Sequence, residues 1–256
     1  MSVTEDGAVL LAGQELFLGG PRELLGRIAE LVPADRVHAV ITPNVDQTLT
    51  MQEDPALRRA YDEATLRITD GTPLVVLGRL LGADGLIRLT GADLLVYAAR
   101  RAPKEGWRIA LTGGAPDVAD HAAEHLREQY GADVVAVPFP RIGSVDDPAS
   151  SSVIDALTEV APDLVFVCLG SPKQDTWVSH WRDALPPAVY IGAGAAVDFV
   201  AGTKKRAPRA VQRAGGEWLF RLAQEPRRLA GRYLVRGPHF IAVAYRSWRA
   251  ARGGRS

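Results

Sequence analysis

The chain has 256 residues and a mass of 27.5 kDa, enough for one large α/β domain or for one domain with an appendage. Hydrophobic residues make up 47% and charged residues 23%, values of ordinary globular proteins that exclude a disordered or fibrous chain. The single cysteine, Cys168, excludes a disulfide framework and a cysteine-rich zinc site.

The net charge of zero hides two parts of opposite charge. Residues 203–256 contain 14 Lys and Arg against two acidic residues, a net charge of +12, and residues 1–202 carry the compensating −12. Such a split indicates a basic segment directed at an anionic partner: a membrane surface, a nucleic acid or phosphates bound by the body. We therefore predict two units, a catalytic domain of residues 1–202 and a basic appendage of residues 203–256.

The start of the chain has neither the basic nor the long apolar region of a signal peptide. No apolar run approaches the roughly 20 residues that a membrane-spanning helix needs. These features favour a cytoplasmic protein.

Between residues 36 and 200, short apolar runs alternate with stretches whose apolar residues recur at helical spacing. Strands that are apolar throughout and separated by helices are typical of a parallel sheet covered on both faces. We predict a doubly wound, mostly parallel, Rossmann-like α/β fold, followed by a mainly helical appendage. The predicted strands are 37–42, 66–69, 108–112, 134–137, 164–169 and 189–192, and the predicted helices are 44–62, 73–82, 91–102, 116–130, 149–161 and 172–184.

Polar residues follow the first two predicted strands. Thr42-Pro43-Asn44 offers a hydroxyl and an amide for sugar hydroxyls, or else forms a turn in which Asn44 caps a helix. Asp70-Gly71 places a carboxylate where a general base would sit, or else Asp70 is an N-cap. Local sequence leaves both pairs of alternatives open. Because ligands of open α/β sheets bind beyond the carboxyl ends of the strands, we expect these segments to meet at one crevice.

Glycine-rich turns follow the later strands. Thr112-Gly113-Gly114 resembles a phosphate-binding turn at a helix start. Neither this turn nor the one at 192–197 completes the dinucleotide fingerprint, which disfavours NAD, and a P-loop is missing from the sequence. In the turn at 170–175, a lysine followed by Gln174 fits a diphosphate or a sugar, or else an exposed helix start.

The sequence predicts neither a metal site nor a cofactor. His121 and His125 have the four-residue spacing of a chelating pair on a helix, but a third ligand is not evident. The chain also lacks the Asp-x-Asp pair that often holds a divalent cation on a nucleotide diphosphate. We therefore expect a metal-independent site.

Eight motifs occur in order over roughly residues 14–235: Thr42-Pro-Asn44, Thr69-Asp70-Gly71, Arg88-x-x-Gly91-x-Asp93, Thr112-Gly113-Gly114, Gly170-Ser-Pro-Lys-Gln174-Asp175, Gly192-Ala-Gly-Ala-Ala-Val-Asp198-Phe, Ala201-Gly-Thr-Lys-Lys-Arg-Ala-Pro208, and Glu217-Trp-Leu-Phe-Arg221 continuing to Arg227, Arg228, Arg232 and Tyr233. Together, and at matching spacing, they resemble the WecG/TagA/CpsF family of bacterial glycosyltransferases (glycosyltransferase family 26). One departure is Asp175, where the family pattern ends in Glu.

The resemblance implies inverting transfer of an N-acetylhexosamine, typically N-acetylmannosamine, from a UDP-sugar to a polyprenyl-diphosphate-linked sugar in cell-wall, teichoic acid or other polysaccharide synthesis. By motif position, Asp70 would be the general base, and Thr42 and Asn44 would line the sugar and acceptor pocket. The remaining implied binding residues are Arg88 and Gln174 for the diphosphate or sugar, Asp198 for the donor nucleotide, Gly113 and Gly114 for a diphosphate, and Arg221, Arg227, Arg228 and Arg232 as arginines that the appendage contributes to the site.

The appendage would also dock at the inner face of the cell membrane, which makes the protein peripheral. Each basic residue near an anionic leaflet contributes roughly 1 kcal/mol, and the aromatic residues among the arginines suit the interface. We disfavour nucleic acid as the partner of the basic segment. The alternative hypothesis is a non-catalytic or regulatory protein that binds a nucleotide sugar on the same fold. Such a protein would usually have lost Asp70, which is present in this sequence. The sequence leaves open the sugar, the acceptor and whether the chain forms homo-oligomers.

Overall fold

The computed structural model describes residues 1–208, 210–211 and 216–224, together with residues 240, 242, 244, 245 and 249. The side chains of Trp218 and Arg221 fall outside this description. Among the helices of this part of the chain, none is long and apolar enough to cross a membrane.

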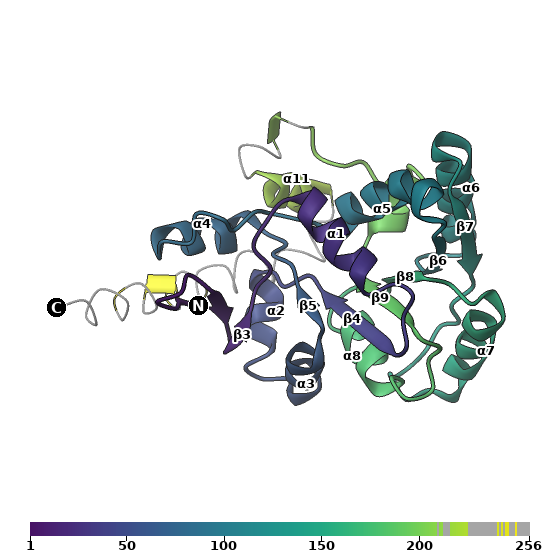
Figure 1. Cartoon of the computed structure of the whole chain (residues 1–256), viewed down its shortest axis with the longest axis horizontal. Helices are drawn as coiled ribbons and strands as arrows, with labels where there is room; N and C mark the ends of the chain where they lie inside the picture. The colour runs from purple at the N-terminus through teal and green to yellow at the C-terminus, as the bar shows by residue number, and fades with distance from the viewer. Residues whose placement is uncertain are drawn as a thin grey trace.

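A six-stranded parallel sheet forms the centre of the protein, with strand order β5-β4-β9-β8-β6-β7 (Figure 1). All six strands fall on the predicted apolar runs, and the predicted α/β fold is confirmed. The chain runs from β4 outward to β5 at one edge of the sheet, and later from β6 outward to β7 at the other edge. The strand order therefore reverses near the middle of the sheet, where such folds bind ligands. The strands are β4 (Val37–Ile41), β5 (Leu66–Arg67), β6 (Arg108–Gly113), β7 (Asp133–Val137), β8 (Leu164–Cys168) and β9 (Ala188–Gly192).

Helices cover both faces of this sheet (Figure 1). One face packs against α1 (Pro21–Glu30), α5 (Gly91–Glu105), α6 (Val118–Tyr130) and α9 (Ala196–Val200). The other packs against α2 (Val45–Thr50), α3 (Pro55–Glu63), α4 (Thr72–Leu80), α7 (Ser151–Val160) and α8 (Lys173–His180). A further helix, α11 (Glu217–Gln224), lies in the basic segment.

The strand sequences divide the core into two clusters. In β8, Val165 and Val167 point into one cluster, whereas Leu164, Phe166 and Cys168 point into the other. Successive side chains of a strand alternate between the two faces, and both faces are buried here, so every residue of β8 is apolar. This explains the uninterrupted apolar runs in the sequence.

Two features differ from the predicted elements. The stretch 44–62 forms two helices, because Asp54 caps a new helix by accepting hydrogen bonds from the backbone N–H of Ala56 (2.9 Å) and Leu57 (3.1 Å), and Pro55 begins it. Helices α1 and α9 and a small antiparallel sheet were not predicted; the sheet consists of β1 (Ser2–Val3), β2 (Val9–Leu11) and β3 (Gln14–Glu15). Strands of two or three residues are too short to show periodicity.

Two glycines give a matched test of how α5 packs at the carboxyl edge of the sheet. A Cβ on Gly91, the first residue of α5, would lie 2.6 Å from the backbone Cα of Ala193, which follows β9. We expect Gly91→Ala to lower the free energy of unfolding by roughly 1–3 kcal/mol, because the two backbones must separate. A Cβ on Gly26, inside α1, would meet no atom within 4 Å. Gly26→Ala should therefore stabilise the protein by roughly 0.5–1 kcal/mol.

Urea unfolding of both variants measures the two effects. Equal free energies of unfolding for the two variants would contradict the close approach of α5 to the loop after β9.

Candidate active site

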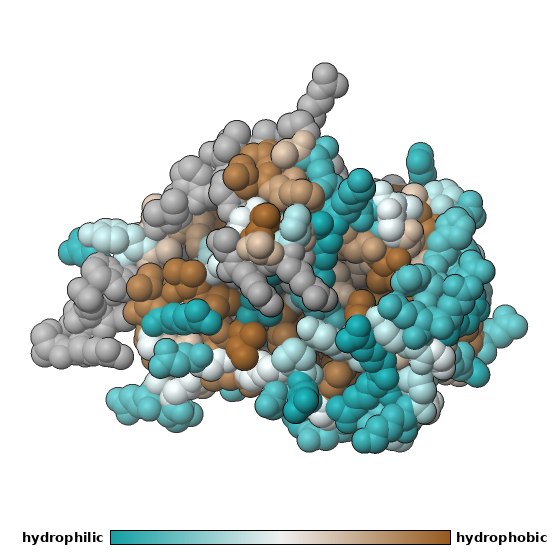
Figure 2. All heavy atoms as spheres, turned by 90° about the horizontal axis from the view of Figure 1, so that it is seen from above, coloured by the Kyte–Doolittle hydropathy of each residue, from teal (hydrophilic) through white to brown (hydrophobic). Residues whose placement is uncertain are grey.

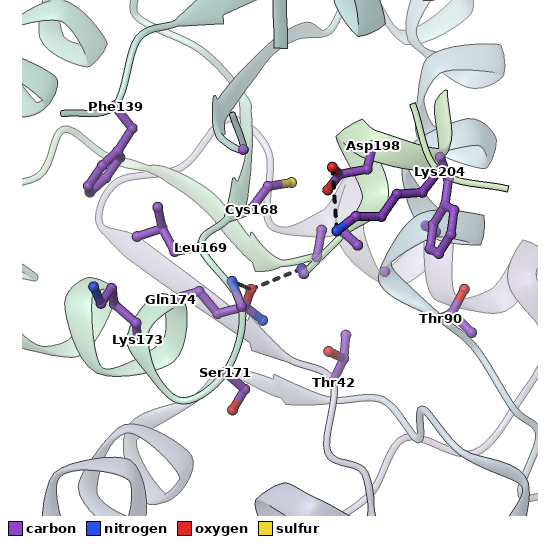
Figure 3. A pocket seen from close by; sticks show the side chains of 18 of the residues that line it. Thr42, Thr90, Phe139, Cys168, Leu169, Ser171, Lys173, Gln174, Asp198 and Lys204 are labelled. Carbon is purple, nitrogen blue, oxygen red and sulfur yellow. Dashed lines mark hydrogen bonds and ion pairs between the residues drawn. The ribbon is translucent and has the colours of Figure 1, made fainter. Parts of the chain in front are cut away.

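A cavity of about 790 Å³ opens at the carboxyl ends of the parallel strands (Figure 3). The loops after β4, β5, β6, β7, β8 and β9 all contribute to its lining, as the position of strand ends in an open α/β sheet requires. Its volume lies within the range of small-molecule sites. Six of the predicted residues line it: Thr42, Asn44, Asp70, Gly114, Gln174 and Asp198.

Asp70 reaches the cavity through a turn that only glycine allows. The backbone N–H of Asp70 donates to the carbonyl oxygen of Pro43 (2.9 Å), which holds the turn against the loop after β4. Gly71 follows with φ +143°, a conformation that L side chains rarely adopt, and a Cβ there would lie 3.8 Å from Cβ of Asn44. The Asp70-Gly71 turn therefore sits beside Asn44 at the same wall of the cavity.

Thr42 and Asn44 both have structural partners. The Thr42 hydroxyl donates to the carbonyl oxygen of Gly192 (3.0 Å), which joins the ends of the neighbouring strands β4 and β9. Asn44 caps α2, since its Oδ1 accepts from the backbone N–H of Gln47 (3.1 Å), while Gln47 Oε1 accepts from the N–H of Asn44 (3.1 Å). The capping alternative is thus confirmed for Asn44, and the same residue also lines the cavity.

Gln174 forms the floor of the cavity between two loops (Figure 3). The residue is 3% exposed, and its Oε1 accepts hydrogen bonds from the backbone N–H of Gly170 (3.1 Å) and Gly194 (2.9 Å). These donors belong to the loops after β8 and β9. Gln174 therefore holds together two of the loops that shape the cavity.

Asp175 lies buried directly beside this floor. Gln47 Nε2 donates to its Oδ2 (2.9 Å). Burial raises the pKa of Asp175 to about 6, and hydrogen bonds to Gln47, Ser171 and Gln174 limit the rise. The Asn44 cap is in this way connected, through Gln47, to the segment that follows β8.

The two glycines after β6 differ in position. Gly113 does not line the cavity; it has φ +93°, and a Cβ there would lie 2.8 Å from the carbonyl group of Cys168, so the residue serves close packing of β6 on β8. Gly114 lines the cavity, but its N–H donates to the carbonyl oxygen of Cys168 (3.1 Å). In this structure the Gly114 N–H therefore donates to the protein backbone and not into the cavity.

Cys168 also lines the cavity, and its chemistry excludes one mechanism. The thiol is buried, which raises its pKa to about 12. Only a thiolate is an effective nucleophile, so Cys168 does not supply one at neutral pH.

Arg88 points elsewhere and joins a network of charges. It pairs with Glu217, the first residue of α11. Arg206 donates to both carboxylate oxygens of Asp93 (2.6 and 2.9 Å) and lies near Glu217. Burial alone would raise the pKa of Asp93, but hydrogen bonds from Arg206 and Thr90 outweigh it and hold the pKa below its usual value. The network thus ties the basic segment to the body beside the cavity.

The remaining predicted residues are Asp198 and four arginines of the basic segment. Asp198 forms an ion pair with Lys204 (3.6 Å) at the side of the cavity opposite Lys173 and Phe139 (Figure 3). The backbone of Arg221 lies in α11, but its side chain is outside the described part, as are Arg227, Arg228 and Arg232 altogether.

Several lining residues were not among the predicted site residues. Three are cations, Arg141, Lys173 and Lys204, and two more are Phe139 and Gln47. Lys173 and Lys204 lie inside recognised motifs and could have been chosen from them. Phe139 and Arg141 lie in the loop after β7, whose sequence carries no motif. Across the described residues, no three His, Cys, Asp or Glu side chains come together as a metal site.

The sequence model described as "Glycosyl transferase WecG/TagA/CpsF family" matches residues 11–254. The match covers the six-stranded sheet, the cavity and all but the last two residues of the basic segment.

Because Asp175 is buried, we expect the free energy of unfolding of the protein to depend on pH. Its folded-state pKa of about 6 is above the ordinary value of 3.8, so the unfolded state loses its proton first as pH rises. The carboxyl therefore destabilises the fold increasingly between about pH 4 and pH 6, by roughly 3 kcal/mol at pH 7. Asp175→Asn keeps an acceptor for Gln47 and does not ionise, so it should gain stability relative to wild type between pH 4.5 and pH 7.5.

Urea unfolding of both proteins at the two pH values measures this gain. Asp155→Asn, which changes an exposed carboxyl on α7, is the matched control and should show a far smaller change. An equal difference between Asp175→Asn and wild type at both pH values would contradict the assignment.

Proposed function

The chain belongs to the WecG/TagA/CpsF family of glycosyltransferases, and we propose that it transfers an N-acetylhexosamine, N-acetylmannosamine in particular, from a UDP-sugar to a polyprenyl-diphosphate-linked sugar with inversion. The family acts in cell-wall and polysaccharide synthesis, with nucleotide-sugar donors and lipid-linked acceptors. The observation that carries the proposal is that Asp70 lines a cavity whose wall also contains cationic side chains.

The positions of base and cations support an inverting displacement. Asp70 follows β5, at one edge of the sheet, whereas Arg141 and Lys173 follow β7 and β8, which lie beyond β4 and β9 from that edge. Inversion requires that the acceptor oxygen and the leaving group lie on opposite sides of the anomeric carbon. A base at one side and phosphate-binding cations at the other meet this requirement.

In the proposed step, the acceptor hydroxyl oxygen forms a bond to the anomeric carbon of the donor as its proton passes to the Asp70 carboxylate. The bond between that carbon and the diphosphate oxygen breaks, and UDP leaves with the electron pair. Arg141 and Lys173 stabilise the charge that develops on the diphosphate. Positioned proton transfer of this kind contributes roughly 10²–10⁴-fold to a rate.

The other lining residues take supporting roles in this proposal. Thr42 and Asn44 adjoin Asp70 and would contact the acceptor and the transferred sugar, and Gln174 would hold the loops around them. Asp198 would lie at the donor nucleotide. Gly114 would adjoin the donor diphosphate from the cavity wall, whereas Arg88 and Gly113 would act from outside the cavity lining. The appendage would add Arg221, Arg227, Arg228 and Arg232 to the diphosphate site.

The basic segment supports a location for the reaction. Its net charge of +12 suits an anionic membrane surface, where a lipid-linked acceptor resides. We propose peripheral attachment to the inner face of the cell membrane and no nucleic-acid partner. Arginines before Tyr233 would serve the site and those after it the membrane.

Replacement of Asp70 tests the reaction and the base together. Asp70→Asn should lower acceptor-dependent UDP release at least a hundredfold, because the amide cannot take the proton. The substrates are UDP-N-acetylmannosamine and a short-chain prenyl-diphosphate-linked N-acetylglucosamine. UDP-sugar affinity, measured by calorimetry, should change little.

Asp84→Asn, an exposed carboxyl in the loop after α4, is the control and should keep full activity. Retained activity in Asp70→Asn would remove Asp70 as the base. Loss of donor binding together with activity would show a structural role instead.

The proposed chemistry uses no metal ion, since cationic side chains stabilise the diphosphate. Excess EDTA should therefore leave the rate of UDP release unchanged within about twofold. Inhibition that added Mg²⁺ or Mn²⁺ reverses would refute this part of the proposal.

A further inference from the structure

The outer face of α4 is apolar except for Arg79. Toward the core, α4 buries Leu74, Val75 and Leu77. Toward solvent it presents Pro73, Val76 and Leu80, a stripe at helical spacing that we call the apolar stripe; Val76 is 48% and Leu80 64% exposed. A surface helix normally carries polar residues on its outer face, so this exposed apolar face requires an explanation.

Helix α6 shows the usual pattern of a surface helix, since its exposed face carries Asp120, Glu124 and Glu128. An apolar outer face is therefore not a general property of the helices in this fold.

Exposed apolar residues also gather near α4. In the described part of the chain five large hydrophobic residues are exposed, and besides Val76 and Leu80 they include Ile87 and Leu219. The Arg88–Glu217 ion pair brings the loop that contains Ile87 against the start of α11, which contains Leu219. Figure 2 shows brown, hydrophobic atoms on the left, where α4 lies in Figure 1, and again over α11. Such a grouping is typical of a binding surface, whereas single exposed residues are not.

Tight packing fixes α4 in place. A Cβ on Gly78 would lie 2.5 Å from Cδ2 of Leu86, so the helix approaches the following loop as closely as a glycine permits. Leu74 and Leu77, on the buried side, are 0% and 4% exposed. The stripe is therefore displayed by a rigid element.

The stripe begins at the cavity and leads away from it. Asp70 lines the cavity and α4 starts two residues later at Thr72. With a rise of 1.5 Å per residue, Val76 lies about 6 Å and Leu80 about 12 Å along the helix axis from Thr72. In Figure 1, α4 extends to the left of β5, away from the centre of the sheet.

We propose that the apolar stripe binds the first isoprene units of the lipid-linked acceptor as the chain leaves the cavity. This inference rests on the proposed function, which puts the acceptor sugar at Asp70. An acceptor in that position has its diphosphate and then its hydrocarbon chain further from the base, and the stripe supplies apolar surface on such a path. Arg79, exposed on the same helix, adds a cation where anionic headgroups would adjoin the hydrocarbon.

The test compares two acceptors that carry the same sugar diphosphate, one on a farnesyl chain and one on a methyl group. In the double variant Val76→Ser/Leu80→Gln, kcat/KM for the farnesyl acceptor should fall about tenfold, while kcat/KM for the methyl acceptor stays unchanged. A tenfold loss is about 1.4 kcal/mol, which roughly 55 Å² of buried apolar surface supplies. Val76→Ile/Leu80→Met, which keeps the stripe apolar, is the matched control and should behave as wild type.

Equal losses for the two acceptors, or a loss for neither, would overturn the inference. Transfer by the wild type to neither acceptor would instead refute the proposed function. In that event, equilibrium binding of farnesyl diphosphate decides the inference: the Ser/Gln variant should bind about tenfold more weakly than wild type and the Ile/Met control. Equal affinities, or a self-association that sedimentation shows to be lost in the Ser/Gln variant, would assign the stripe to another occupant.

Discussion

The geometry of the site depends on the hydrogen bonds that the buried side-chain amide of Gln174 accepts. One oxygen accepts the backbone N–H of Gly170 and of Gly194, and so fixes the loops after β8 and β9 relative to each other. The next residue, Asp175, accepts from the side chain of Gln47, whose backbone N–H donates to the capping side chain of Asn44. A Cβ on Gly192 would lie 2.7 Å from both the Gln174 amide and the Asp175 carboxylate, so this arrangement needs glycine at the end of β9. Buried polar groups of this kind specify one geometry because any other leaves them unpaired.

The local sequence was sufficient to predict the strands and the residues that follow their carboxyl ends. The strands are apolar on both faces, so their runs could be recognised without knowledge of their neighbours. The carboxyl ends of parallel strands share one edge, and for that reason Asp70, Asn44 and Gln174, although far apart in the chain, were correctly expected in one crevice.

Features that depend on distant partners could not be predicted in the same way. Arg88 has the sequence context of a substrate-binding residue, yet its side chain pairs with Glu217, 129 residues away. Arg141 lines the cavity from a loop without a motif, and its position depends on where β7 ends in the sheet. The break between α2 and α3 had a local signal, Asp54-Pro55, that the helical spacing of the surrounding residues concealed.

The charge network has a consequence for how the protein can be divided. Arg206 and Glu217 lie beyond the change in composition near residue 202, whereas their partners Asp93 and Arg88 belong to the body. A fragment cut at residue 202 would retain a partly buried carboxylate and a partly buried guanidinium without their countercharges, which is costlier than losing exposed pairs. If this fragment were inactive, damage beside the cavity and loss of contact with the membrane could not be distinguished as the cause. A fragment that ends after Gln224 keeps both pairs and separates the two effects.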